Sequence, residues 1–171
     1  MDEQSLSAPP KPPEMQRRIT MYPAQFIGMC LIALVPLLAL VGVFGERIDS
    51  TDANNSVFSL HVDYPALFRY KTDNLIMVRV ENRSSQVIDT ATVSLTTSYI
   101  ARFSNVVFTP DASRVTSDAY EVELENIQPN EGRVVTVELE ARDAGRFGGV
   151  IRVSASSVEP LQANITTMVF P

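Results

Sequence analysis

The sequence predicts an all-β domain, an antiparallel sandwich of about seven or eight strands, behind one transmembrane helix. Two observations predict this fold class. Residues 19–45 form a single apolar stretch without a charged side chain. From residue 57 onward, apolar residues recur at every second position in short segments, which is the spacing of strands with one buried and one solvated face. A chain of 171 residues has room for one ordinary domain and one additional segment.

The apolar stretch is long enough to cross a membrane as a helix. At about 1.5 Å per residue it would reach roughly 40 Å, whereas a hydrocarbon core is about 30 Å thick. It lacks the polar stripe that a helix packed on a soluble core would show. We therefore predict a transmembrane helix over residues 19–45. This span includes Ala24, Phe26, Cys30, Pro36 and Phe44.

A cleaved signal peptide is the alternative for this stretch. Signal peptides have a shorter apolar core, about 7–15 residues, followed by small residues at the cleavage site. The best candidate site here, Val43-Phe44-Gly45, matches that pattern poorly, so we expect the helix to be retained as an anchor. Lys11, Arg17 and Arg18 precede it, and the positive-inside rule then places the N-terminus in the cytoplasm. The remaining chain is expected on the periplasmic or extracellular side of a bacterial inner membrane.

The composition divides the chain into four predicted parts. Residues 1–18 are rich in proline and poor in apolar side chains, which indicates a disordered cytoplasmic tail. Residues 19–45 are the helix, and Pro36 is expected to kink it, which either shapes a docking surface or is simply tolerated. Residues 46–56 contain the polar turn formers STDANNS and are predicted to be a linker. Residues 57–171 are the exported β-sandwich domain.

Eight segments of the exported part show strand periodicity. The alternation is clearest in Asn74–Asn82, Tyr120–Asn126, Arg133–Arg142 and Gly149–Ser156. It is weaker in Val57–Asp63, Thr90–Thr97, Val106–Thr109 and Asn164–Phe170. No helical period is found after residue 45, and short strands at this spacing favour an antiparallel sandwich.

One predicted hairpin joins the last two of the clearest strands through residues 143–149. Its register pairs Leu139 with Ile151 on the buried face. The same register sets Glu138 opposite Arg152 on the solvated face, where opposite charges form a favourable cross-strand pair.

The connection Ile127–Arg133 is predicted to differ. A tight hairpin there would set Glu121 opposite Glu138, and like charges directly opposite each other are unfavourable. We therefore expect the chain to cross from one sheet to the other at this point, as in Greek-key sandwiches.

Three longer stretches carry a resemblance to a known class of domain. They read VRVENRSSQVIDTATVSL, YEVELENIQPNEGRVVTVELEA and GRFGGVIRVSAS. This series resembles prokaryotic immunoglobulin-like or fibronectin-III-like modules. The resemblance implies an immunoglobulin-like Greek-key sandwich and, only loosely, a function; single-pass proteins with such a domain include assembly factors and accessory subunits of respiratory oxidases. Copper delivery, which the copper chaperones among them perform with closely spaced cysteines, is not implied because the exported part has no cysteine.

Residues with catalytic potential are few. Cys30, the single cysteine, lies in the predicted span, so no intrachain disulfide, redox pair or thiolate metal cage is possible. His61, the single histidine, shares a strand face with Asp63 at i, i+2 spacing. The two form either a proton-exchanging pair or, more simply, a surface histidine beside an acid. We predict no enzyme activity, no catalytic residue and no cofactor.

Acidic side chains provide one candidate metal site. Glu121, Glu123 and Glu125 share one strand face, where a hard cation such as calcium could bind, although a solvated face explains the pattern more simply. The first 45 residues balance their charges, so the net charge of −6 belongs to the exported part. An acidic domain argues against nucleic acid and against adsorption on anionic lipid. No small-molecule substrate is indicated.

Two functional hypotheses follow. In the first, the helix docks on an integral-membrane partner, and the sandwich presents an edge strand or loops to a second protein. In the second, His61, Asp63 and the row of glutamates beginning at Glu121 make the chain a metal-handling or catalytic accessory of a membrane complex. Sequons for N-glycosylation begin at Asn54, Asn82 and Asn164. We expect these sequons to be unused, because the cysteine-free exported part is of bacterial type.

Overall fold

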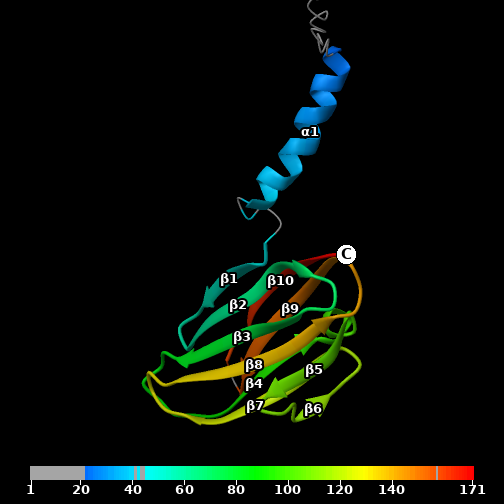
Figure 1. The fold of residues 1–171 in the computed structure, drawn as a ribbon. Coiled ribbons are helices and arrows are strands. Elements are labelled where there is room, and N and C mark those ends of the chain that lie inside the picture. Colours follow the sequence, from blue (N-terminus) through cyan, green and yellow to red (C-terminus); the bar gives the residue numbers. More distant parts are fainter. Residues whose placement is uncertain (1–21, 41, 43–44, 157) are drawn as a thin grey trace, which may run out of the picture. The chain divides into compact units, whose positions relative to one another are not determined.

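Two compact units, residues 1–43 and 44–171, make up the chain. The computed structural model describes residues 22–40, 42, 45–156 and 158–171. The first unit contains helix α1 (Pro23–Leu40), which lies inside the predicted span and is long and apolar enough to cross a membrane, as an anchor or as a signal sequence (Figure 1). The helix includes Ala24, Phe26, Cys30 and Pro36. Phe44 and the predicted tail at residues 1–18 lie outside the described residues.

The second unit is built mainly from strands. These are β1 (Arg47–Asn54), β2 (Phe58–Arg69), β3 (Asp73–Asn82), β4 (Ile88–Thr96), β5 (Phe103–Thr109), β6 (Arg114–Val115), β7 (Ala119–Ile127), β8 (Gly132–Ala141), β9 (Gly145–Ala155) and β10 (Leu161–Phe170). One short helix, α2 (Thr97–Ile100), follows β4. All eight strands predicted from the alternation are present, and β1 and β6 are additional.

The strands form one sheet that curls over on itself, so that its two halves enclose a common core (Figure 1). Its order is β5-β8-β3-β2-β10-β9-β4-β7-β6, and β1 pairs with β2. One half thus contains β5, β8, β3, β2 and β1, and the other contains β10, β9, β4, β7 and β6. The alternation works as predicted, because every second side chain of β3, namely Ile76, Val78 and Val80, is buried.

Strand β2 joins the two halves and corrects the prediction of a purely antiparallel sandwich of seven to eight strands. Its first part, Phe58–Asp63, pairs antiparallel with β3. Its last residues, Leu67–Arg69, pair in parallel with β10. Pro65 lies between the two parts and has no N–H to donate to a sheet ladder. The sheet is therefore mixed, with ten strands in the described residues.

The predicted hairpin through residues 143–149 is wrong. Strand β8 pairs with β3 and β5, whereas β9 pairs with β10 and β4. Glu138 therefore lies opposite Leu75 and Val107 instead of Arg152. The reason is that period-two alternation determines which face of a strand is buried but does not select the neighbouring strand.

The predicted crossing at Ile127–Arg133 is confirmed. Strand β7 pairs with β4 and β6, whereas the next strand, β8, lies in the other half of the sheet. Glu121 is consequently opposite Ser94 and Arg114. The like-charge pair with Glu138 that a tight hairpin would create is avoided.

The predicted linker at residues 46–56 is also corrected, because Arg47–Asn54 form β1. This strand pairs antiparallel with β2, and its register sets Asp52 opposite His61. Alternation could not reveal it, since its one large apolar side chain, Ile48, is 70% exposed. Backbone hydrogen bonds to β2, not burial of an apolar face, hold this strand in place.

Candidate functional site

The outer face of the half that contains β1, β2, β3, β8 and β5 carries an exposed row of aliphatic and acidic side chains. Glu138 of β8 lies directly between Leu75 of β3 and Val107 of β5. Leu75 is 40% exposed and Val107 is 51% exposed. The pleat explains this exposure, because residues adjacent to the buried Ile76 point to the opposite face.

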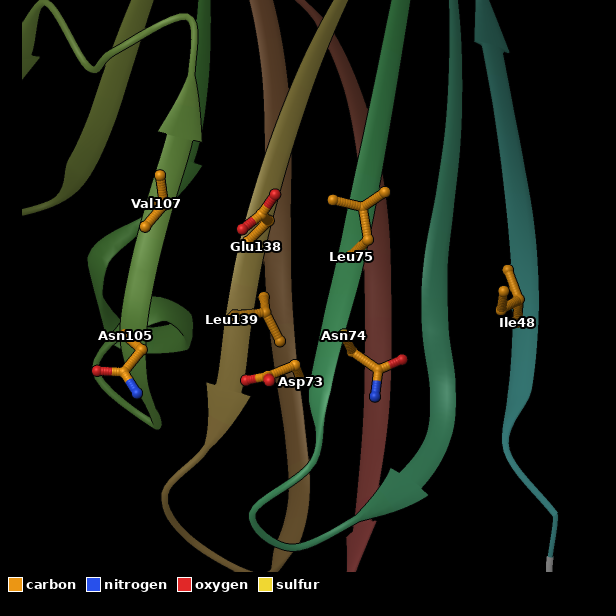
Figure 2. A pocket seen from close by; sticks show the side chains of 8 residues that line it. All are labelled: Ile48, Asp73, Asn74, Leu75, Asn105, Val107, Glu138 and Leu139. Carbon is orange, nitrogen blue, oxygen red and sulfur yellow. The ribbon is translucent and has the colours of Figure 1, made fainter.

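A groove of about 620 Å³ runs over this row (Figure 2). Its lining residues are Ile48, Asp73, Asn74, Leu75, Asn105, Val107, Glu138 and Leu139. The pairing of β2 with β3 ends at Asp63 and Met77, so the first residues of β3 have β8 as their register partner but no partner in β2. The groove lies over this part of β3, where β2 has turned toward β10. We call it the β3–β8 groove.

Carboxylates gather at one end of the β3–β8 groove. Asp73 lies directly opposite Glu140 in the register of β3 and β8. Asn105 donates a hydrogen bond from Nδ2 to Glu140 Oε2 at 2.6 Å. Asp73 and Glu138 form no ion pair with any residue that the structure describes. The Nδ2 atom of Asn74 is buried there and has no hydrogen-bond partner in the described part of the chain.

A second polar cluster on the same half of the sheet centres on His61. The imidazole Nδ1 lies 2.5 Å from Asp52 Oδ1, and Nε2 lies 3.2 Å from Asp63 Oδ1. Arg79 is the register partner of His61 on β3. The i, i+2 spacing predicts the proximity of His61 and Asp63 but not the contact with Asp52, because the composition of residues 46–56 predicts a linker there. The imidazole therefore has a carboxylate at each ring nitrogen, Asp52 from β1 and Asp63 from its own strand β2.

The same contacts favour the protonated, positively charged form of His61. The hydrogen bond with Asp52 raises the pKa of the imidazole above its usual value; partial burial opposes this shift, and the negative charges of Asp63 and Asp52 add to it. A histidine whose folded-state pKa is raised stabilises the fold below its unfolded pKa of about 6.5. That contribution is lost as the pH rises through the folded-state value.

Replacing His61 by glutamine is therefore expected to have a pH-dependent effect. The variant should be less stable than the wild type at acidic pH, by roughly 0.5 kcal/mol because the imidazole is partly solvated. The difference should vanish at alkaline pH, where the wild-type imidazole is neutral. Denaturant unfolding of both proteins across this pH range checks the prediction. A difference that grows with pH would contradict it.

The predicted glutamate row lies elsewhere. Glu121, Glu123 and Glu125 are on β7, where they face Ser94, Thr92 and Thr90 of β4 across the strand pair. Arg114 Nη1 approaches Glu121 Oε2 to 3.9 Å. Among the described residues no group of three or more His, Cys, Asp or Glu side chains is arranged to hold a metal ion. His61 and Asp63 are on β2, in the other half of the sheet, so the residues of the second hypothesis are not brought together.

The fold and the site define a mostly β domain, built from one curled, mixed sheet, that follows one apolar helix in the sequence and carries an aliphatic and acidic groove on one sheet face. No protein-family model matches the chain, and no curated protein matches it. Among solved structures it is similar to the CARDB domain of a Pyrococcus furiosus protein in complex with di-metal ions, with 13% identity, 68% of this chain and 96% of that chain covered, and a TM-score of 0.46.

Two further solved structures are similar to the chain. One is the cupredoxin domain of amoB from Nitrosocaldus yellowstonii, with 15% identity, 58% of this chain and 56% of that chain covered, and a TM-score of 0.37. The other is BslA, a bacterial hydrophobin, with 11% identity, 74% of this chain and 100% of that chain covered, and a TM-score of 0.39. All these identities are below 25% and all these TM-scores are below 0.5, so the similarities assign neither a family nor a function.

Proposed function

We propose that this chain is a membrane-anchored, extracytoplasmic protein-binding module and serves as an accessory subunit of a membrane protein complex. The observation that carries the proposal is the β3–β8 groove, where the aliphatic side chains of Leu75 and Val107 are exposed on a pleated sheet face. Exposed apolar groups that cluster over a hollow and are bordered by polar groups are typical of protein-interaction surfaces.

Helix α1 supports the anchored location in this proposal. It is an uncharged helix of 18 residues, close to the length that crosses a hydrocarbon core. Lys11, Arg17 and Arg18 precede it in the sequence, which favours a cytoplasmic N-terminus in a bacterial inner membrane. The proposal includes an integral-membrane partner for the helix and no catalytic role for the β domain.

Purification of the tagged full-length chain from native membranes in a mild detergent tests the proposal. We expect a membrane protein to copurify in stoichiometric amount with the helix, and recovery of a second protein, bound at the groove, to fall when Leu75→Ser and Val107→Ser are combined. The matched control combines Val87→Ser with Val115→Ser, which removes two exposed valines outside the groove and should leave recovery unchanged. Purification as a monomer without partner, or recovery of a salt-washed soluble chain that begins near residue 46, would contradict the proposal.

A further inference from the structure

We infer that the β3–β8 groove binds an extended segment of a partner protein in which a basic residue has an apolar residue two positions away on each side. This inference rests on the proposed binding function and names the chemistry of the partner. Its starting point is the row Leu75, Glu138 and Val107, in which one carboxylate is flanked on neighbouring strands by two exposed aliphatic side chains (Figure 2). A lysine or arginine side chain matches such a row, because its aliphatic stem packs on apolar surface while its charged end reaches the carboxylate.

The spacing of the row fits a strand-like segment. Neighbouring strands are about 4.8 Å apart, so the two aliphatic side chains on either side of Glu138 are separated by roughly 10 Å. Alternate residues of an extended segment are about 6.5–7 Å apart and point to the same side. A short extended segment with one basic residue and an apolar residue two positions before and after it can therefore present all three side chains to the groove of about 620 Å³, with the basic one at Glu138 and the apolar ones toward Leu75 and Val107.

The carboxylates at the β3–β8 groove lack a cationic partner among the described residues. Asp73 and Glu140 are directly opposite each other, an arrangement that is unfavourable for like charges. Asn105 donates to Glu140, whereas Asp73 and Glu138 form no ion pair with the described residues. A basic side chain would offset this repulsion through charge-assisted contacts with the carboxylates.

Charge also selects among the possible occupants. A second copy of this chain would bring the same acidic groove and a net charge of −6, and like charges repel. Anionic lipid is disfavoured for the same reason. A bare metal ion has no set of three converging ligands among the described residues. A basic and apolar polypeptide segment satisfies both the carboxylates and the aliphatic surface.

The test uses the full-length chain in nanodiscs of zwitterionic lipid and three labelled pentapeptides as probes. These are a lysine–valine probe, Val-Ser-Lys-Ser-Val, a lysine–serine probe, Ser-Ser-Lys-Ser-Ser, and a glutamate–valine probe, Val-Ser-Glu-Ser-Val, and binding is followed by fluorescence anisotropy. We expect the first probe to bind about tenfold more tightly than either of the others, a factor that corresponds to about 1.4 kcal/mol. Absence of binding, or equal binding of the lysine–serine probe, would overturn the inference.

Two charge-neutralising variants separate the β3–β8 groove from the overall charge of the domain. Asp73→Asn combined with Glu138→Gln should weaken binding of the lysine–valine probe about tenfold, since two charge-assisted contacts are lost. Glu123→Gln combined with Glu125→Gln changes the net charge by the same amount on the other half of the sheet and should leave binding unchanged. Equal losses in both double variants would show that only the net charge matters and would overturn the inference.

Thermal unfolding checks the repulsion between the groove carboxylates, and copurification distinguishes this inference from the proposed function. Thermal unfolding of the Asp73→Asn and Glu138→Gln double variant should be unchanged or shifted upward, because a like-charge repulsion is removed. If the wild-type chain copurifies with a membrane partner while the lysine–valine probe does not bind, the proposed function stands and the inference fails. If the probe binds but no partner copurifies, the groove chemistry is correct and the proposed accessory role fails.

Discussion

Replacing Asn82 by alanine is expected to lower the free energy of unfolding by about 3–4 kcal/mol, because buried groups lose their hydrogen-bond partners. Asn82 is fully buried at the end of β3. Its Nδ2 donates to the carbonyl oxygens of Gln86 at 2.8 Å and of Ile127 at 3.0 Å. Its Oδ1 accepts from the Ser84 backbone N–H at 2.9 Å and from the Ser84 hydroxyl at 2.7 Å. One side chain thus joins the turn after β3 to the end of β7.

Asn164→Ala is the matched control for Asn82→Ala. Asn164 also begins a sequon, but its side chain is exposed on β10, so its removal should change stability by less than about 0.5 kcal/mol. Denaturant unfolding followed by circular dichroism measures both variants. The prediction fails if the two substitutions are equally mild.

The contacts of Asn82 also bear on glycosylation at this sequon. Because both donor contacts of Asn82 Nδ2 are made inside the fold, a glycan on that nitrogen would disrupt them, in agreement with the expectation that this sequon is unused.

Replacing Gly149 by alanine is expected to destabilise the β domain by about 2–3 kcal/mol, the usual range for overpacking a core. A Cβ at this position would lie 2.7 Å from Cγ of Tyr99. Tyr99 has little room to move, because its ring is fully buried and its hydroxyl shares a hydrogen bond of 2.8 Å with Thr167 Oγ1. Burial raises the pKa of this phenol to about 12. Its ring also packs against Phe103 at a centroid distance of 4.9 Å.

Gly148→Ala provides the adjacent control for Gly149→Ala. The nearest atom to a Cβ at position 148 is the carbonyl oxygen of Ile165 at 4.0 Å, so an alanine side chain fits there without a clash. The midpoint temperature of thermal unfolding should therefore fall strongly for Gly149→Ala and only slightly for Gly148→Ala. Tyr99→Leu should reduce the cost of Gly149→Ala if the ring is the obstacle. An unreduced cost in that double variant would assign the effect to the backbone instead.

Residue patterns in the sequence predict only part of the candidate site. The alternation around Ile76 predicts that Leu75 faces outward, and the i, i+2 spacing predicts that His61 and Asp63 share a face. Neither pattern predicts that Glu138 lies between Leu75 and Val107, because these residues come from three strands that are distant in sequence. The sequence does contain one indication of the site. On the predicted strands, some positions on the solvated face carry aliphatic or acidic side chains.

Asp52 illustrates a second limit. Its segment, IDSTDAN, has no apolar alternation, so it resembles a linker by composition. Pairing with β2 makes it a strand and brings its carboxylate to His61. Such a polar edge strand is held by main-chain hydrogen bonds, which every residue except proline can form. Composition alone therefore gives no indication of it.

The amino-acid sequence by itself determined the uncharged helix near the N-terminus, the eight alternating strands, the face that each strand buries, and the change of sheet half after Ile127. The helix, the strands and their buried faces are local properties, since burial of alternate side chains depends on a strand's own period-two pattern, whereas the change of sheet half follows from the like charges that a hairpin would place opposite each other. Only the tertiary structure decided that β8 lies beside β3 and β5, that β2 joins the two halves in parallel with β10, and that β1 completes the sheet. Strand partners are chosen by long-range packing and by backbone hydrogen bonds that are chemically alike for all strands, so the β3–β8 groove exists only after the whole sheet has formed.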